Sequence, residues 1–323
     1  MFSSVTVQNK NGDTPLHLAL QQGQVDVIPI LIEHGADVTN QNKDGDTALH
    51  MASYQGQDNI ARMLIEHGAD VAAQNKDGDT PLHMASYEGQ VSVARMLIEH
   101  GVDVLAQSKD GHTSLHLASY RGQVDVTHML IEHGADVTAQ NKDGDTPLHL
   151  ALLQGQVNVT PILIERGVGV TAQNRDGDTP LHTASYQGQI DVARMLIEHG
   201  ADVTAQNKYG DTPLHMTSHQ GHVDVARMLI EHGADVTAQN NDGDTPLHLA
   251  LYERQAGVAR MLIEHGADVT ARNKVGDTPL RVASYRRQLD IAYMLIERGA
   301  GPDVAVWATY GPSTARKTTV IKE

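Results

Sequence analysis

The chain has 323 residues and a formal net charge of −16 at pH 7, an acidic balance that argues against binding to the phosphate groups of nucleic acids. It contains no cysteine, which excludes disulfide bonds, a thiolate nucleophile and cysteine-based zinc sites. The start of the chain lacks an export signal, and no apolar run approaches the roughly 18 residues that a membrane span needs. We therefore expect a cytoplasmic or nuclear protein that binds neither nucleic acid nor membrane.

A single period of 33 residues organises almost the whole chain. After a short lead-in over residues 1–8, a turn glycine recurs at the same place in nine successive units, at Gly12, Gly45, Gly78, Gly111, Gly144, Gly177, Gly210, Gly243 and Gly276. Such self-similarity is typical of solenoids, in which each unit packs only on its neighbours. We predict nine repeats over residues 9–305, followed at 306–323 by a decayed tenth repeat and a frayed tail.

The second repeat illustrates the expected local structure. Gly45 supplies the permissive backbone of a tight turn, and Thr47 is a natural N-cap for a helix over residues 48–55. Gly56 can end that helix in the left-handed conformation. A second helix, over about 58–67, carries a stripe of apolar residues too wide for a lone surface helix. Stability must therefore come from stacking each repeat on the next.

Three segments of each repeat closely resemble the ankyrin repeat over essentially residues 9–305. They are the turn and first helix D-G-x-T-P-L-H-x-A, the central glycine, and the later L-I-E-x-G-A-D-V. The resemblance implies an all-α solenoid of paired antiparallel helices with protruding β-hairpin fingers. It also implies a concave groove that binds other proteins, and a structural role for the histidine of T-P-L-H.

Two places depart from the repeat pattern. In the fifth repeat Val168 and Gly169 replace the usual Ala-Asp, from which we predict a flexible joint across residues 165–180. In the eighth and ninth repeats Arg254 and Arg287 replace the central glycine. A positive φ there would cost a non-glycine residue about 1 kcal/mol. Terminal repeats of solenoids are commonly atypical, so these arginines indicate a C-terminal cap.

The 19 histidines raise the question of a metal site, but their spacing argues against one. Equivalent histidines lie one repeat apart, roughly 8–10 Å, whereas zinc holds its ligand nitrogens about 2.0–2.1 Å from one ion. The turn around Gly45 resembles a calcium loop only loosely, because Ser53 stands where the bidentate acid is required. No phosphate-binding loop or catalytic motif occurs. We therefore expect no metal, no cofactor and no enzymatic activity.

One aromatic row is the candidate binding site. Six tyrosines share a single repeat position near the end of the first helix, which faces the groove in ankyrin-like proteins, and tyrosine is enriched among residues that dominate binding energies. The adjacent side chain varies among Gln, Glu and Arg, and some finger positions also vary. The predicted partner-binding residues are Tyr54, Tyr87, Tyr120, Leu153, Tyr186, His219, Tyr252 and Tyr285 of the row, with Glu88, Arg121, His112 and Tyr209. The alternative is that the rings only pack on neighbouring repeats and were copied with them.

These observations favour a non-catalytic scaffold, a monomeric array that binds another protein on its groove and finger surface. One alternative is a mechanical spacer without a ligand. Another is the sensing array of a larger signalling receptor, since uniform arrays of this kind resemble those joined to nucleotide-binding signalling domains in fungi. A binding module predicts that the variable groove positions matter, whereas a spacer predicts tolerance there and dependence on repeat number.

Overall fold

The computed structural model describes residues 5–167 and 169–301, and its regular structure there is helical. Eighteen helices lie in this part of the chain, and they form pairs that follow the sequence repeat. None of them is long and apolar enough to cross a membrane. The predicted decayed repeat at 306–323 lies outside the described residues. The chain comprises two units, residues 1–175 and 176–323.

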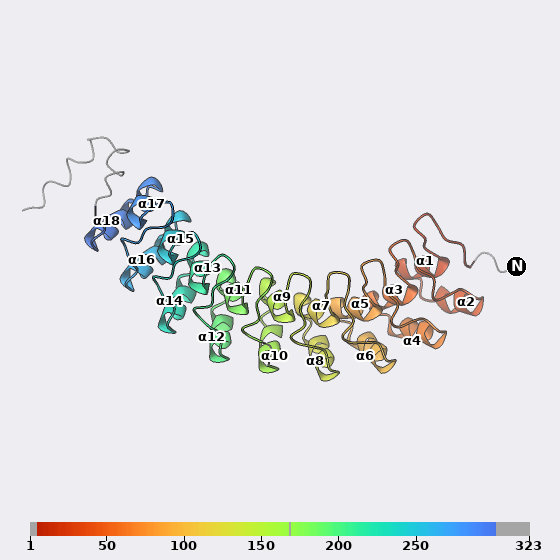
Figure 1. The fold of residues 1–323 in the computed structure, drawn as a ribbon. Helices are drawn as coiled ribbons and strands as arrows, with labels where there is room; N and C mark the ends of the chain where they lie inside the picture. The colour runs from red at the N-terminus through yellow and green to blue at the C-terminus, as the bar shows by residue number, and fades with distance from the viewer. Residues whose placement is uncertain (1–4, 168, 302–323) are drawn as a thin grey trace, which may run out of the picture. The chain divides into compact units, whose positions relative to one another are not determined.

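In the first unit the helices form two rows, with the connecting loops projecting beyond the row of first helices (Figure 1). The first helices are α1 (Pro15–Gln21), α3 (Ala48–Gln55), α5 (Pro81–Glu88), α7 (Ser114–Arg121) and α9 (Pro147–Leu153). The second helices are α2 (Val27–Glu33), α4 (Asp58–Glu66), α6 (Val91–Glu99), α8 (Val124–Glu132) and α10 (Val159–Glu165). Within this unit each first helix packs against the neighbouring first helices, from α1 to α9, and against the second helix of its own repeat.

The second unit repeats this arrangement, with first helices packed in one row and second helices in the other. Its first helices are α11 (Pro180–Gln187), α13 (Pro213–Gln220), α15 (Pro246–Tyr252) and α17 (Pro279–Tyr285). Its second helices are α12 (Ile190–Glu198), α14 (Val223–Glu231), α16 (Ala256–Glu264) and α18 (Leu289–Glu297). In both units the core between the rows is aliphatic, because the buried hydrophobic positions hold Leu, Ala, Val, Ile and Met.

The boundaries of α3 and α4 follow from their caps. Thr47 has extended backbone (φ −91°, ψ 168°), and its hydroxyl accepts a hydrogen bond from the His50 N–H, so the helix begins at residue 48 as predicted. Gly56 ends α3 in the left-handed conformation with φ 67°. The second helix spans residues 58–66, and His67 caps it by placing its Nδ1 2.8 Å from the Met63 carbonyl oxygen. A ring nitrogen facing a carbonyl must donate, so this cap satisfies one of the free carbonyls at the helix end.

The histidine of T-P-L-H joins one repeat to the next. The His50 Nδ1 accepts from the Thr47 backbone N–H at 3.2 Å, which leaves Nε2–H to donate to the Asp79 carbonyl oxygen at 3.0 Å. Equivalent bonds recur along the described chain. Burial lowers the pKa of these imidazoles, to about 4 for His83 and His116, because it disfavours the charged form. The histidine is therefore a neutral structural connector between repeats.

The predicted β-hairpin fingers are not confirmed, since the described part of the chain contains no residue in a β-strand. The finger is instead a tight turn held by an asparagine at its start, or by Ser108 in the fourth repeat. The Asn42 Oδ1 accepts from the backbone N–H groups of Asp44 (2.9 Å) and Asp46 (3.0 Å). One backbone bond passes to the next finger, from Lys76 N–H to the Asp44 carbonyl at 2.8 Å. A β-ladder needs successive paired bonds, which one bond per finger does not supply.

Gly45 lies at the closest approach of two fingers. Its φ is 81°, and a Cβ built on it would lie 2.6 Å from the Lys76 nitrogen. Both the left-handed backbone and the contact with the next finger therefore require glycine at this position. The same close approach recurs at the turn glycines of the first eight repeats.

Proline shortens the second helix in the first and fifth repeats. Pro29 is the third residue of α2, and Pro161 is the third residue of α10. Both helices begin two residues later than their counterparts in other repeats. The first four N–H groups of a helix have no acceptor within it, so a proline in the first turn removes no helical hydrogen bond. The helix start has moved to accommodate the proline.

The two arginines at the central glycine position adopt the left-handed backbone conformation. Arg254 has φ 59° and Arg287 has φ 60°, and they are the only non-glycine residues with positive φ in the described chain.

The predicted flexible joint at residues 165–180 includes one residue that the structure does not describe. Its Val168 lies outside the described residues, so the joint stays a prediction.

Candidate functional site

The tyrosine row lies at the ends of the first helices, where its side chains remain accessible. In the first unit its members are Tyr54 (α3), Tyr87 (α5), Tyr120 (α7) and Leu153 (α9). In the second unit they are Tyr186 (α11), His219 (α13), Tyr252 (α15) and Tyr285 (α17). Tyr54, Leu153, Tyr186 and Tyr285 expose 44–48% of their surface, and the other tyrosines of the row are half-buried. The side chains of the row are therefore neither fully buried nor fully exposed.

Four members of the row interact with the residue 34 positions later, which stands beside the row position of the following repeat. The Arg121 guanidinium lies over the Tyr87 ring, 4.7 Å from its centroid. In the second unit, Arg286 stands in the same relation to Tyr252 at 6.0 Å. A guanidinium within about 6 Å of a ring centroid is attracted by the negative face of the aromatic system. Each of these two tyrosines therefore has an arginine guanidinium of the next repeat packed over its ring.

Carboxylates occupy the same place in two other repeats. Glu88 raises the pKa of Tyr54, chiefly by accepting a hydrogen bond from its hydroxyl. The Glu253 Oε1 lies 3.8 Å from the His219 Nε2, a pairing that becomes ionic when the imidazole is protonated. The residue beside the row therefore sets whether a ring meets a positive or a negative group, and the sequence varies it from repeat to repeat.

The last two tyrosines of the row are held more firmly than the others. The Tyr252 hydroxyl accepts from the Asn273 Nδ2 at 2.9 Å, and the Tyr285 hydroxyl donates to the Asp277 Oδ2 at 3.3 Å. Burial raises the pKa of both phenols, and hydrogen bonding between the two hydroxyls raises that of Tyr285 further. Both hydroxyls therefore stay protonated at neutral pH.

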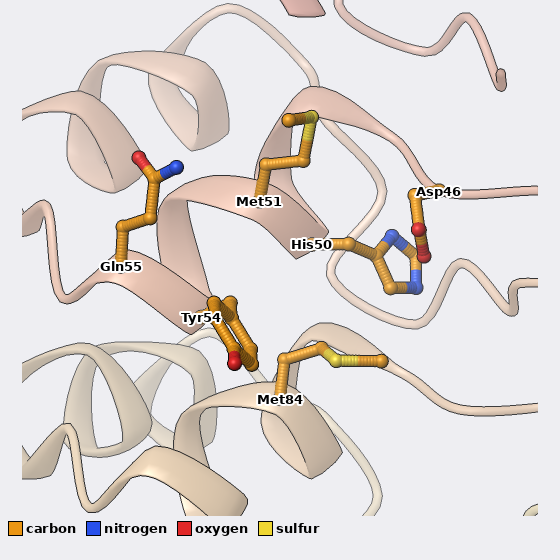
Figure 2. Close-up of a pocket in the computed structure, with 6 residues that line it drawn as sticks. All are labelled: Asp46, His50, Met51, Tyr54, Gln55 and Met84. Atoms are coloured by element: carbon orange, nitrogen blue, oxygen red, sulfur yellow. The ribbon is translucent and has the colours of Figure 1, made fainter. Parts of the chain in front are cut away.

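A shallow hollow of about 280 Å³ opens beside Tyr54 between the second and third repeats (Figure 2). The close-up shows the Tyr54 ring directed toward Met84, with Asp46 next to the His50 imidazole. Six residues line the hollow: Asp46, His50, Met51, Tyr54, Gln55 and Met84. Apolar surface from one aromatic and two thioether side chains thus meets one carboxylate.

The predicted finger residues occupy two different places. His112 stands at the repeat position of Asp46, half-buried, and its ring makes an edge contact with His116 at 5.7 Å between centroids. Tyr209 stands at the position of Asp44, where its side chain is 59% exposed. By the repeat register, His112 corresponds to Asp46, which lines the hollow beside Tyr54. Tyr209 corresponds to the exposed finger residue Asp44.

Sequence reasoning missed Asp46, Met51 and Met84 as lining residues. A signal was present, because Met51 and Tyr54 are three residues apart on one helix and so share a face. Met84 occupies the Met51 position in the next repeat. Comparing adjacent columns across two repeats would have brought the three together.

Among residues 5–167 and 169–301, no three His, Asp or Glu side chains are grouped so as to hold an ion. A comparison with curated proteins finds no match. The family model described as ankyrin repeats (3 copies) matches residues 2–75, 71–141, 133–207, 200–273 and 239–306. These matches cover most of the sequence, and the paired helices agree with them. The chain belongs to the ankyrin-repeat family.

Proposed function

We propose that this chain is a non-catalytic scaffold, a monomeric array of nine repeats over residues 9–305 that binds a partner protein along the tyrosine row and the adjoining fingers. Ankyrin repeats generally mediate interactions between proteins rather than catalysis. The observation that carries the proposal is the half-exposure of the row, in which Tyr54, Tyr186 and Tyr285 expose 45–48% of their surface. Tyrosine combines a large apolar face with a hydrogen-bonding hydroxyl, which suits a protein interface.

The arrangement of the row also supports binding at more than one point. A protein interface of standard size buries about 800 Å² on each partner, which requires a surface extending over several repeats. The variable residues beside the row place different charges next to neighbouring rings. Tyr54 has the Glu88 carboxylate beside it, and Tyr87 has the Arg121 guanidinium. A partner segment that crosses several repeats would therefore meet a defined order of acidic and basic positions, and charge complementarity of this kind gives specificity.

Affinity capture from the native cell tests the proposal. A variant with alanine at Tyr87, Tyr120 and Tyr186 should lose at least about tenfold in affinity for the captured partner, because truncating such residues costs 1 kcal/mol or more each. The matched control replaces Arg62, Arg95 and Arg194, which are exposed on the second helices, by alanine. The control should bind as the wild type does.

The melting temperature separates binding from packing. It should change little in the tyrosine variant if the row is a binding surface. A fall of more than about 10 °C would instead favour rings that mainly pack between repeats. Equal capture by the wild type and both variants would mean that the partner binds away from the row. Capture of no specific partner by any of them would favour the spacer alternative.

A further inference from the structure

We propose that the hollow beside Tyr54 is a subsite for one basic side chain, Lys or Arg, of the partner protein. The inference rests on the proposed function and adds the chemistry of the contact. Its first support is the shape and lining of the hollow. Met51, Met84 and Tyr54 provide apolar surface, and Asp46 provides a carboxylate at one side (Figure 2). Lys and Arg lay their methylene stems on apolar surface while their charged heads seek an anion.

The second support is the state of the Asp46 carboxylate. Its Oδ1 accepts a 2.9 Å hydrogen bond from the Asn75 Nδ2, which fixes the side chain in place. No hydrogen bond or ion pair within the described chain uses Oδ2. A half-buried carboxylate that is held at one oxygen can offer the other to an incoming guanidinium or ammonium group without a large ordering cost.

The third support is the charge around the ring. None of the six lining residues is Lys or Arg. The His50 imidazole is also neutral, because burial lowers its pKa and Nδ1 accepts from the Thr47 N–H. The hollow therefore combines an aromatic face, two thioether side chains and the Asp46 carboxylate. The Glu88 carboxylate lies beside it at the Tyr54 hydroxyl, where Arg121 has a weaker opposing effect.

The fourth support comes from the protein itself. At Tyr87 and Tyr252 the residue 34 positions later is an arginine, and its guanidinium lies 4.7 Å and 6.0 Å from the respective ring centroid. At Tyr54 the same position holds Glu88. The row thus receives a cation from its own chain in two repeats, and next to Tyr54 the chain supplies a carboxylate instead. A basic side chain of the partner would make there the contact that Arg121 makes with Tyr87.

The test uses the full chain with ¹³C-methyl-labelled methionine and follows the Met51 and Met84 resonances by NMR. The probes are the peptide acetyl-Gly-Gly-Arg-Gly-Gly-amide and its citrulline counterpart, which keeps the shape of arginine but lacks its charge. The arginine peptide should shift both methyl signals in a saturable way. The citrulline peptide should bind at least about fivefold more weakly, because it loses the charge-assisted contacts. Equal binding of the two peptides would overturn the proposal.

Two substitutions place the effect in this hollow. Asp46→Asn keeps an oxygen for Asn75 but removes the charge, and it should weaken the arginine peptide about fivefold. Glu88→Arg brings an internal guanidinium to Tyr54, as Arg121 does at Tyr87, and should abolish the shifts. Asp77→Asn makes the same chemical change as Asp46→Asn at an exposed finger residue outside the hollow, and should leave binding unchanged. Unaltered binding in both Asp46→Asn and Glu88→Arg would contradict the assignment.

The outcome is separable from that of the proposed function. If capture depends on Tyr87, Tyr120 and Tyr186 but the peptide titration shows no preference for arginine, the row binds a partner and the basic-side-chain subsite is wrong. If the titration succeeds but capture ignores the three tyrosines, the hollow binds cations and the row is not the binding surface for that partner.

Discussion

The Arg121 guanidinium lies over the ring of Tyr87, 4.7 Å from its centroid, so that a side chain of one repeat covers an aromatic ring of the repeat before it. The contact shows how the row can serve packing and binding together. One face of such a ring is used within the array, while the residue keeps part of its surface in contact with solvent. Its contribution to stability should accordingly be small.

A double-mutant cycle on Tyr87 and Arg121 measures that contribution. We expect a coupling of about 0.5–1 kcal/mol in the free energy of unfolding, the range typical of exposed cation–π pairs. Urea unfolding of the wild type, Tyr87→Ala, Arg121→Ala and the double variant provides the value. A coupling above about 2 kcal/mol would mean that the pair anchors the two repeats, and the packing interpretation of the row would then prevail.

Acidification should destabilise the array through its buried histidines. Their folded-state pKa lies below the unfolded value of about 6.5 and reaches about 4 for His83 and His116. The unfolded chain therefore binds more protons between these pH values, so stability is complete above pH 6.5 and is lost as the pH falls toward 4. Each of these two histidines should cost about 1 kcal/mol between pH 7.5 and pH 5.5.

Thermal unfolding at the two pH values checks this effect. The melting temperature should be lower at pH 5.5, and an unchanged value would contradict the neutral buried state of the T-P-L-H histidines. The exposed His67 provides a control, because His67→Gln removes a histidine without touching the buried set. That variant should show the same loss of stability on acidification as the wild type.

Glycine at the positions of Arg254 and Arg287 should stabilise the protein. Both arginines have φ near 60°, a backbone conformation that costs a side chain about 1 kcal/mol and costs glycine little. Each Arg→Gly substitution should therefore raise the free energy of unfolding by up to about 1 kcal/mol. At position 254 the gain is reduced by the loss of the exposed hydrogen bond that Arg254 donates to the Arg286 carbonyl. Arg254→Ala is the matched control, because it removes the same side chain but keeps the strain. Equal stability of the glycine and alanine variants would show that the backbone is not strained there.

The segment 165–180 should exchange its amide hydrogens faster than the equivalent segments of other repeats. It follows the shortened helix α10, contains Gly169 in place of the usual Asp, and includes the division between the two units at Arg175. Locally weak regions exchange through small openings, whereas packed regions require larger ones. Hydrogen exchange read by mass spectrometry gives the comparison, with residues 132–147 as the control. Equal rates in the two segments would refute the flexible joint.

The local rules of the repeat were predictable from the sequence because each depends on a few neighbouring residues. Thr47 and Gly56 fix the two ends of α3, and the tight turn at Gly45 follows from its own residues. The contact of Gly45 with Lys76 of the next finger was not predictable in this way. The fingers were less predictable. Whether a turn extends into paired strands depends on hydrogen bonds to the next finger, and only one such backbone bond forms at each.

The candidate site was predictable in outline but not in detail. A repeating column of tyrosines is visible in one dimension, and its place at the helix ends follows from the period. The hollow beside Tyr54 is built by two repeats, with Met84 brought to the ring by stacking rather than by nearness in sequence. The contact between Tyr87 and Arg121 likewise depends on which rotamers the stacked helices permit.

Site-specific photo-crosslinking tests the central claim most directly. Benzoylphenylalanine at Tyr186, which is 45% exposed in the row, replaces one aromatic residue by another. Placed at Arg194 on the second helix α12, it reports on the other row of helices. Our account predicts that the captured partner crosslinks strongly to position 186 and at background level to position 194. Crosslinking at 194 without crosslinking at 186 would contradict it.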